Sequence, residues 1–185
     1  MQQLNSLPDN LPIPLDDGAC RHLIEQLIPN IALKSTNNDL INPSKIKGWV
    51  VFYCYPKTGH PDKQLPEGWD SIPGARGCTP QSCAYRDHFQ TLTQLNTQVF
   101  GLSTQDTGYQ KEAAERLHLP YPLLSDLELK FSDSLALPTF ELNGARLNKR
   151  VTLIAYNGVI KHYFYPVFPP DQNATEVISW LSHHV

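Results

Sequence analysis

Residues 73–87 read PGARGCTPQSCAYRD and hold two of the four cysteines, Cys78 and Cys83, five positions apart. The Gly- and Pro-rich part before Cys78 excludes a regular element there, whereas the part after it favours a helix. Thr79 would be the N-cap of this helix, and Pro80 would stand in its first turn, where the missing N–H costs nothing. Cys78 is therefore expected at or just before a helix N-terminus. There, unpaired N–H groups and the helix dipole stabilise the nucleophilic thiolate.

Three other interpretations of the cysteine pair are open. A buried, inert pair is common in cytosolic proteins, and a structural disulfide needs an oxidising compartment, for which no secretory signal argues. A zinc site would need further ligands at metal-ligand spacing, and His88 is one candidate, but no second Cys-x-x-Cys follows. The pattern favours a catalytic pair over these alternatives.

Residues 77–87, GCTPQSCAYRD, resemble the active-site segment of the peroxiredoxins (the AhpC/TSA redoxin family), in particular the PrxQ or bacterioferritin-comigratory-protein type. The pattern in that family is Gly-Cys-Thr-x-x-Ala/Ser-Cys-x-Phe/Tyr-Arg-Asp, which is more specific than a lone Cys-x-x-Cys. The resemblance implies that Cys78 is the peroxidatic cysteine and Cys83 the resolving one. It runs roughly from residue 27 to the C-terminus, with further landmarks at residues 100–103, 122–126 and 150–154.

The composition is that of an ordinary soluble globular protein. The chain has 185 residues, of which 41% are apolar and 18% charged, with a net charge of −3. We expect one domain over residues 1–185, with residues 1–27 as an N-terminal extension. The charge argues against a nucleic-acid partner, and no apolar run approaches membrane-spanning length, so no membrane partner is expected. No signal peptide is visible, and we expect a cytoplasmic, reducing compartment.

The apolar patterns predict alternating strands and helices. Two continuous apolar, aromatic and β-branched runs, at 48–55 and 97–104, are typical of strands buried on both faces. Asn157-Gly158 joins two alternating runs, which is a strong hairpin signal. The other expected elements are helices at 19–28, 79–95, 109–119, 127–137 and 173–180, a short strand at 31–33, a loop or short strand at 121–126, and hairpin strands at 149–156 and 159–165.

This order of elements predicts an α/β fold: a mainly parallel central sheet extended by an antiparallel hairpin, with helices on both faces. It is also the order of the thioredoxin-like fold that the resemblance implies. Residues 59–77 form a long loop that leads to Cys78, and we expect this loop to be functional. Cys54, inside a buried strand, is expected to be a packed core thiol, and Cys20 a small apolar or surface residue.

A thiol peroxidase cycle requires the two cysteines to come closer than the expected helix allows. A thiolate attacks a peroxide oxygen and becomes a sulfenic acid, a nearby thiol condenses with it to a disulfide, and an external dithiol restores both thiols. In an unbroken helix the Cα atoms of Cys78 and Cys83 are about 8.6 Å apart, which exceeds the limit of roughly 7 Å for a disulfide. We therefore hypothesise that the first turns of the helix unwind on oxidation.

A second positive group should stabilise the thiolate and the peroxide oxygens. In the peroxiredoxins this group is an Arg at the start of a late strand, and Arg150 stands at the matching place. Arg76 and Arg86, which are close to the cysteines in sequence, are the alternatives.

The chain departs from the family pattern Pro-x-x-x-Thr-x-x-Cys before the first cysteine. Ala75 stands at position −3 in place of Thr and Ser71 at position −7 in place of Pro, whereas the Pro that follows the strand is Pro56. An insertion after Pro56 accounts for both differences. Thr58 is then the candidate for the missing hydroxyl, with Pro56 and Thr79 as further candidate substrate-binding residues. Backbone N–H groups or the Ser71 hydroxyl are the other possible replacements.

Three functions fit these residues. The first is a thiol peroxidase for hydrogen peroxide or organic hydroperoxides, recycled by thioredoxin or a similar dithiol, without cofactor or metal, as a monomer or weak homodimer. The second is a thiol-disulfide oxidoreductase or redox sensor with little peroxidase activity, which the missing Thr keeps open. The third is a copper carrier with His162 as a distal ligand, although the thioredoxin-like copper chaperones resemble Cys-x-x-x-Cys. Peroxide consumption separates the first two, and copper titration tests the third.

Overall fold

The structure is a computed structural model that describes residue 4 and residues 6–185. The prediction that residues 1–14 are irregular falls partly on residues 1–3 and 5, which lie outside the described residues. In the described part of the N-terminal stretch, the first helical element is the short 3-10 helix η1 (Arg21–Leu23). None of the helices in the described part is long and apolar enough to cross a membrane.

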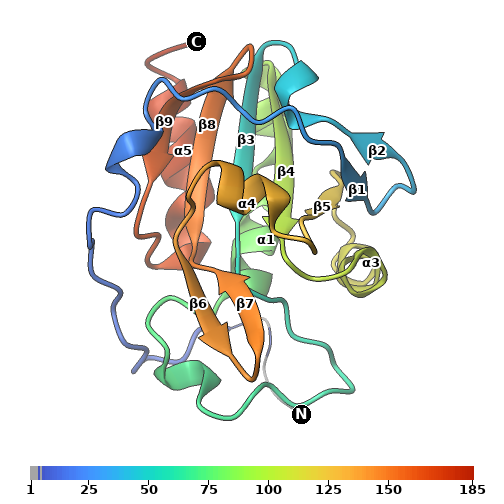
Figure 1. Cartoon of the computed structure of the whole chain (residues 1–185), viewed down its shortest axis with the longest axis vertical. Coiled ribbons are helices and arrows are strands. Elements are labelled where there is room, and N and C mark those ends of the chain that lie inside the picture. The colour runs from blue at the N-terminus through green and yellow to red at the C-terminus, as the bar shows by residue number, and fades with distance from the viewer. Residues whose placement is uncertain (1–3, 5) are drawn as a thin grey trace.

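A seven-stranded mixed sheet forms the centre of the molecule, in the order β2-β1-β5-β4-β3-β8-β9 (Figure 1). β3 pairs in parallel with β4 and antiparallel with β8, and β4 pairs in parallel with β5. A separate two-stranded sheet consists of β6 and β7. The strands are β1 (Leu33–Ser35), β2 (Leu40–Ile41), β3 (Trp49–Cys54), β4 (Thr97–Ser103), β5 (Leu123–Ser125), β6 (Thr139–Leu142), β7 (Ala145–Asn148), β8 (Val151–Tyr156) and β9 (Val159–Phe164).

Helices cover both faces of the sheet, and β3 shows why its sequence is continuously apolar (Figure 1). Successive side chains of a strand point to opposite faces: Val51 and Tyr53 pack with α1, α2 and α5, whereas Phe52 and Cys54 pack with α4 and η1. The helices are α1 (Cys78–Asp87), α2 (Phe89–Gln94), α3 (Thr107–Arg116), α4 (Lys130–Ser134) and α5 (Asn173–Leu181), with short 3-10 turns η2 (Pro43–Lys45), η3 (Trp69–Ser71) and η4 (Pro170–Gln172).

The thioredoxin-like α/β fold predicted from the sequence is confirmed, but the central sheet is mixed and not mainly parallel: β3–β4 and β4–β5 pair in parallel, whereas β1–β2, β1–β5, β3–β8 and β8–β9 pair antiparallel. The two buried runs are β3 and β4, and they form the parallel pair at the centre of the sheet. Asn157 and Gly158 join β8 to β9 with φ values of 48° and 81°. Both values are positive, as a two-residue hairpin turn with the right twist requires.

Two predicted helices are much shorter than expected. Of the helix predicted at 19–28 only η1 forms, and of the helix at 127–137 only α4 forms. Residues with left-handed backbone stop the helical hydrogen-bond ladder in both segments: Glu25 has a φ of 65°, Leu129 a φ of 57° and Ala136 a φ of 47°. The apolar spacing predicted burial only in part, because Leu23 and Ile28 are buried whereas Ile24 and Leu27 are exposed.

Other boundaries also differ from the sequence predictions. The single helix expected at 79–95 is divided into α1 and α2 at His88, where φ is −99° and ψ is 7°. Helix α3 begins two residues before the predicted start because the Asp106 carboxylate caps it by accepting from Tyr109 N at 2.8 Å. The strand expected at 31–33 begins only at Leu33.

The β6–β7 hairpin was not predicted. Its turn, Asn143-Gly144, carries the same Asn-Gly signal as the turn at Asn157 and has φ values of 51° and 77°. The four-residue strands on either side lack a clear alternation of buried and exposed positions, because they pack on the loop before α1 and not on the main sheet.

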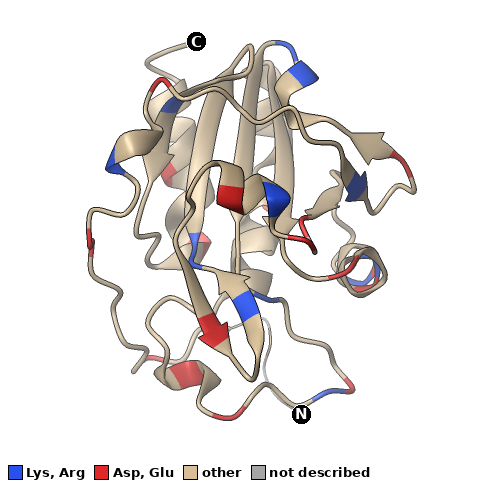
Figure 2. Cartoon of the chain, viewed as in Figure 1, with Lys and Arg blue, Asp and Glu red and all other residues tan. Residues whose placement is uncertain are grey.

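Basic and acidic residues are interspersed along the ribbon (Figure 2). This distribution agrees with the small net charge of −3.

Candidate active site

Gly77 sets the start of the helix that carries both cysteines. It is the N-cap of α1 with a left-handed φ of 105°, and α1 begins at Cys78. The prediction that Thr79 is the N-cap is therefore wrong, because Thr79 already lies inside the helix. A glycine meets a double requirement here: a Cβ at this position would strain the backbone and would lie 2.3 Å from Pro170 Cγ. This tight packing places the Cys78 sulfur at the positive end of the helix dipole.

Arg150 lies directly against the Cys78 sulfur. Its Nη2 atom donates to Sγ at 3.1 Å, and both residues are almost fully buried, at 3% and 2% exposure. As a thiol, Cys78 donates to the Ala75 carbonyl at 3.6 Å. The contact places the positive charge of the guanidinium directly against the sulfur in a site that excludes water, where charges are poorly screened.

The Arg150 guanidinium also joins the active-site helix to the loop before it. Its Nη2 donates to the Ala75 and Arg76 carbonyls at 3.1 and 3.2 Å, and its Nη1 donates to Gln81 Oε1. Gln81 was not among the residues predicted for the site. Its position three residues after Cys78, on the same face of a helix, is the signal that would have found it.

Asn173, the first residue of α5, completes this buried network. Its Oδ1 accepts from Gln81 Nε2 at 3.0 Å, from Tyr85 OH at 2.7 Å and from Thr152 Oγ1 at 2.7 Å. The sequence gave no sign of this role for Asn173. The network fixes Gln81, and Gln81 in turn holds Arg150 against the thiol, so α1, β8 and α5 position the group together.

Cys83 lies on the same helix in a different environment. It is half-buried, and this burial raises its pKa above the ordinary 9.0, although Arg86 and Arg116 oppose the shift. All four cysteines are free, and α1 is continuous from Cys78 to Asp87. The helix geometry that separates Cys78 from Cys83 in the sequence argument is therefore present in the folded protein.

One of the three candidate substrate-binding residues lines the cavity at the sulfur. Thr79 lines this small cavity, whereas Pro56 and Thr58 are not among the described residues that do. The Thr58 hydroxyl, fully buried, donates to Gln105 Oε1 at 3.1 Å. The Pro56 carbonyl accepts from Ser103 Oγ at 3.0 Å. Their role in binding stays a prediction, as does that of Thr79.

The alternative arginines have other partners. The Arg76 side chain forms an ion pair with Asp70 at 3.1 Å. Arg86 pairs with Asp87 at 2.8 Å and donates to the Leu117 carbonyl at 2.9 Å, near Cys83. Of the three candidates, Arg150 is the one for which the structure gives a hydrogen bond to Cys78.

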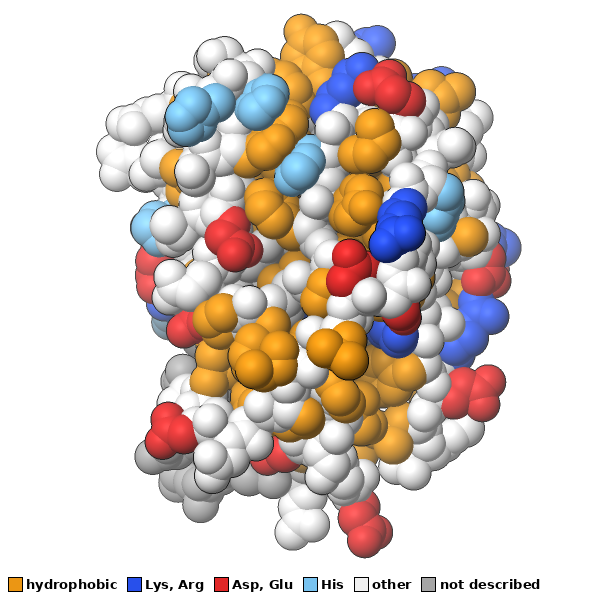
Figure 3. Space-filling model, turned by 90° about the vertical axis from the view of Figure 1, so that its left-hand side faces the viewer, with side chains coloured by type: hydrophobic (Ala, Val, Ile, Leu, Met, Phe, Trp, Pro, Cys, Tyr) orange, Lys and Arg blue, Asp and Glu red, His pale blue; other side chains and the backbone are white. Residues whose placement is uncertain are grey.

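The histidine that a copper carrier would use is stacked on an aromatic side chain. His162 is on β9, where its ring stacks on Trp180 at 4.9 Å, and Trp180 stacks on His184 at 3.8 Å. Figure 3 shows the side of the molecule that lies on the left in Figure 1, and histidines and hydrophobic side chains gather at its upper end. Within residue 4 and residues 6–185 no cluster of three His, Cys, Asp or Glu side chains has metal-binding geometry.

The two remaining cysteines are buried. Cys54 is fully buried in the core, as predicted, and burial raises its pKa. Cys20 is 1% exposed, and burial raises its pKa to about 12. Of the two readings given for Cys20, small apolar or surface residue, the structure supports the first.

Solved structures define the class of fold. The crystal structure of peroxidoxin BcpB from Mycobacterium tuberculosis matches with a TM-score of 0.71 and 21% identity, over 86% of this chain and 96% of that chain. The bacterioferritin comigratory protein of Xanthomonas campestris, described for its alkyl peroxide reduction activity, matches with a TM-score of 0.67 and 15% identity, over 95% and 99%. The chain has the thioredoxin-like fold of the peroxiredoxins, as predicted.

The chain belongs to the Redoxin family, whose sequence pattern matches residues 24–178. It is 30% identical over 154 residues to peroxiredoxin Q, chloroplastic, of Suaeda salsa, with 83% of this chain and 64% of the relative aligned. To peroxiredoxin Q, chloroplastic, of Arabidopsis thaliana it is 30% identical over 157 residues, with 84% and 65% aligned. The chain thus spans somewhat less than two thirds of the length of these relatives, and the resemblance to the peroxiredoxins is confirmed.

Proposed function

We propose that this protein is a thiol peroxidase that reduces hydrogen peroxide or organic hydroperoxides at Cys78. The Cys78 thiolate attacks the terminal peroxide oxygen, an S–O bond forms, the O–O bond breaks, and the leaving hydroxide or alkoxide takes a proton from water. The observation that carries the proposal is the Arg150 Nη2 contact of 3.1 Å with Cys78 Sγ at the first residue of α1. Helix dipole and guanidinium together stabilise the attacking thiolate.

Arg150 is the group that would also bind the developing charge on the peroxide. Preorganised donors at the site of charge development are the largest single contribution in many enzymes. Its Nε is buried without a hydrogen-bond partner in the described part of the chain, so the guanidinium keeps one donor that no described residue uses. Thr79, at the cavity beside Cys78, is the nearest candidate for the missing hydroxyl.

Resolution would use Cys83. Its thiolate attacks the Cys78 sulfenic acid, an S–S bond forms, the S–O bond breaks, and the leaving hydroxide takes up the proton that the Cys83 thiol released to solvent. Because about 8.6 Å separates the two Cα atoms in a regular helix, the first turns of α1 must unwind. This unwinding would break two buried hydrogen bonds of Ser82. Its hydroxyl accepts from Tyr53 OH at 3.1 Å, and its carbonyl accepts from Tyr121 OH at 2.8 Å.

The cycle closes when thioredoxin or a similar dithiol reduces the Cys78–Cys83 disulfide by exchange and is itself oxidised. Cys83 is partly exposed, which supports access by such a partner. We expect this cycle to run in the cytoplasm, without cofactor or metal, in a monomer or weak homodimer formed from a single domain over residues 1–185.

A second candidate is a thiol-disulfide oxidoreductase or redox sensor with the same cysteine pair. The observation that favours it is Ala75, which is 1% exposed at the position where the peroxiredoxins carry a Thr. An alanine offers no hydroxyl to polarise a peroxide, so this function predicts disulfide exchange without fast peroxide reduction.

Stopped-flow reaction of the reduced protein with hydrogen peroxide tests the proposal. Wild type is compared with Cys78→Ser and Cys83→Ser, and sulfenic acid is trapped with a dimedone-type reagent. We expect fast thiol loss that Cys78→Ser alone abolishes, and a trapped sulfenic acid at Cys78 in Cys83→Ser. Thiol loss no faster than that of a free cysteine would reject the peroxidase and leave the oxidoreductase. Cys20→Ser, which alters a buried thiol outside the pair, is the matched control.

A further inference from the structure

The insertion before Cys78 is not a free loop, because it folds against the β6–β7 hairpin. Trp69 of η3 is 3% exposed, and its ring lies 6.3 Å from that of Phe140 on β6. Figure 1 shows the hairpin and η3 at the same end of the molecule, beyond the carboxyl end of β3. We call the apolar set that joins them the lid cluster; it consists of Leu65, Trp69, Ile72, Ala75, Phe140, Leu142 and Leu147.

The lid cluster leaves very little space at the sulfur. The cavity beside Cys78 has a volume of about 10 Å³, and Leu65 and Trp69 from the lid cluster line it together with Lys57 and Thr79. A cavity needs on the order of 10–15 Å³ of such space to hold one water molecule. A molecule the size of hydrogen peroxide therefore requires a small displacement of the walls, whereas an alkyl or aryl hydroperoxide requires the lid cluster to open.

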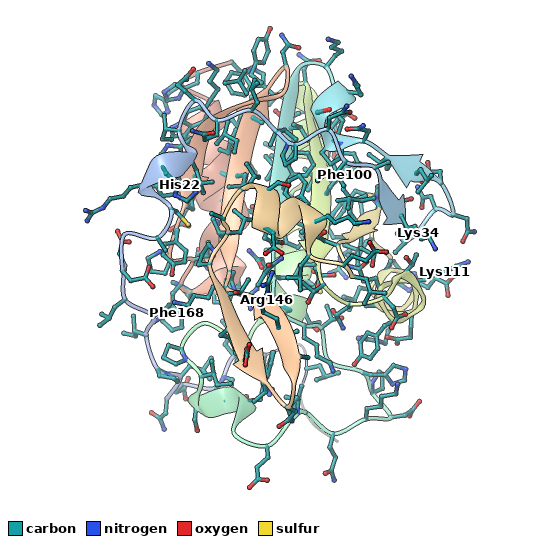
Figure 4. The ribbon with its side chains drawn as sticks, viewed as in Figure 1. His22, Lys34, Phe100, Lys111, Arg146 and Phe168 are labelled. Atoms are coloured by element: carbon teal, nitrogen blue, oxygen red, sulfur yellow. The ribbon has the colours of Figure 1, made fainter. Side chains whose placement is uncertain are left out.

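The insertion is held at both ends and joined to the hairpin in its middle by apolar contacts. Near its start, the Gly59 carbonyl accepts from Arg116 Nη2 at 3.0 Å, and near its end the Ala75 carbonyl accepts from Arg150 Nη2 at 3.1 Å. The hairpin has its own anchor: Arg146 of β7, which is labelled in Figure 4, forms an ion pair with Asp133 of α4. The hairpin is thus one wall of the site. On η3, the Asp70–Arg76 ion pair ties the segment to the residues just before Cys78, whereas Trp69 packs against the hairpin through apolar contacts.

We propose that the lid cluster restricts Cys78 to hydrogen peroxide and other peroxides of similar size, and that Trp69 is the residue that decides this specificity. The inference rests on the proposed peroxidase function. An indole that both lines the cavity and packs in the lid cluster sets the size of substrate that reaches the sulfur, because a bulky peroxide must displace it at the cost of the apolar burial. The reaction with the sulfur is unchanged; the insertion selects which peroxide reaches it.

The first test compares second-order rate constants for oxidation of Cys78 by hydrogen peroxide and by cumene hydroperoxide. Wild type is expected to prefer hydrogen peroxide by at least about 100-fold, a difference typical of steric discrimination of about 3 kcal/mol. Trp69→Ala should raise the rate with cumene hydroperoxide at least about tenfold and change that with hydrogen peroxide little. Phe140→Ala removes the ring that packs on Trp69 from the hairpin side. It should act in the same direction and replaces Trp69→Ala if that variant folds poorly. Trp180→Ala, the same truncation on α5, is the matched control and should leave the ratio as in wild type.

The second test needs no peroxide and so separates the inference from the proposed function. In a Cys83→Ser background, alkylation of Cys78 by iodoacetamide is compared with alkylation by pyrene maleimide, with the site read by mass spectrometry. With the wild-type lid cluster, alkylation of Cys78 by pyrene maleimide should be slowed more than alkylation by iodoacetamide. Trp69→Ala should reduce this difference. Equal relative rates for small and large reagents in both proteins, or equal rates for both peroxides in wild type, would overturn the inference. Selective alkylation without reaction toward either peroxide would overturn the peroxidase and, with it, the assignment of peroxide specificity.

Discussion

Cys78 and Cys83 belong to one helix, yet their surroundings differ in almost every respect. Cys78 is 2% exposed, lies at the helix start and contacts Arg150. Cys83 is half-buried one and a half turns later, its pKa is raised by burial, and its nearby cations, Arg86 and Arg116, only partly offset this. In the proposed cycle Cys78 is the nucleophile, which is best held still against fixed charge, and Cys83 is the resolving thiol, which has to move. The difference teaches that position along a helix can assign two roles to one residue type.

The largest expected effect is that of removing the positive charge of Arg150, which contacts Cys78. Arg150→Gln should slow oxidation of Cys78 by hydrogen peroxide about 10²–10³-fold, which is the loss seen when one preorganised donor is removed from an active site. Alkylation of Cys83 should stay unchanged. Stopped-flow oxidation and mass-resolved alkylation measure the two responses. Equal slowing at both cysteines would mean that the fold, and not the contact, had been lost.

Gly77→Ala should damage the Cys78 end of α1 and spare the Cys83 end. The left-handed φ and the contact with Pro170 predict a loss of about 2–3 kcal/mol in the free energy of unfolding, from backbone strain together with overpacking. Gly48→Ala is the control, because Gly48 has a similar positive φ of 77° but nothing within 4 Å of an added Cβ. Its loss should be about 1 kcal/mol. Urea unfolding distinguishes the two, and equal losses would exclude the clash.

The pH dependence of disulfide formation, the second chemical step, tests the difference between Cys78 and Cys83. Because burial raises the Cys83 pKa above 9.0, its thiolate fraction at neutral pH is small and grows about tenfold for each pH unit below that pKa. Disulfide formation after a single oxidation should therefore accelerate about tenfold per unit between about pH 6 and 8. Quenched-flow trapping of free thiols measures it. A rate that is flat over this interval would show that Cys83 is not deprotonated in the slow step, or that helix unwinding limits it.

The smallest expected effect is that of Arg86→Gln. Arg86 lowers the Cys83 pKa, but its side chain is one-third exposed and already paired with Asp87, so solvent screens its influence. Disulfide formation at neutral pH should slow only about two- to threefold, whereas the first oxidation of Cys78 should not change. Lys45→Gln, on the distant η2, provides the surface-charge control. A loss of Cys78 oxidation would show that the two cysteines share one electrostatic site.

Some parts of the candidate site could be predicted from the sequence, and others could not. The cysteine pair and the helix start followed from local signals, and Arg150 was found only through the resemblance to the peroxiredoxins. The N-cap was assigned to Thr79 because side-chain caps are common, but a glycine with positive φ was required by the approach of Pro170. Nothing local in the sequence indicates that Asn173, 92 residues after Gln81, binds it.

The sequence by itself determined the buried strands, the Asn-Gly turn between β8 and β9, and the reactive motif at the start of α1, because short-range hydrogen bonding and apolar periodicity depend on neighbouring residues. The tertiary structure decided which groups converge on the sulfur and what covers it. Arg150 meets Cys78 across 72 residues of sequence, and Trp69 meets Phe140 from two segments that carry no shared pattern. Such contacts arise only when the sheet brings distant segments together, because they depend on the register of whole elements and not on the propensity of any single one.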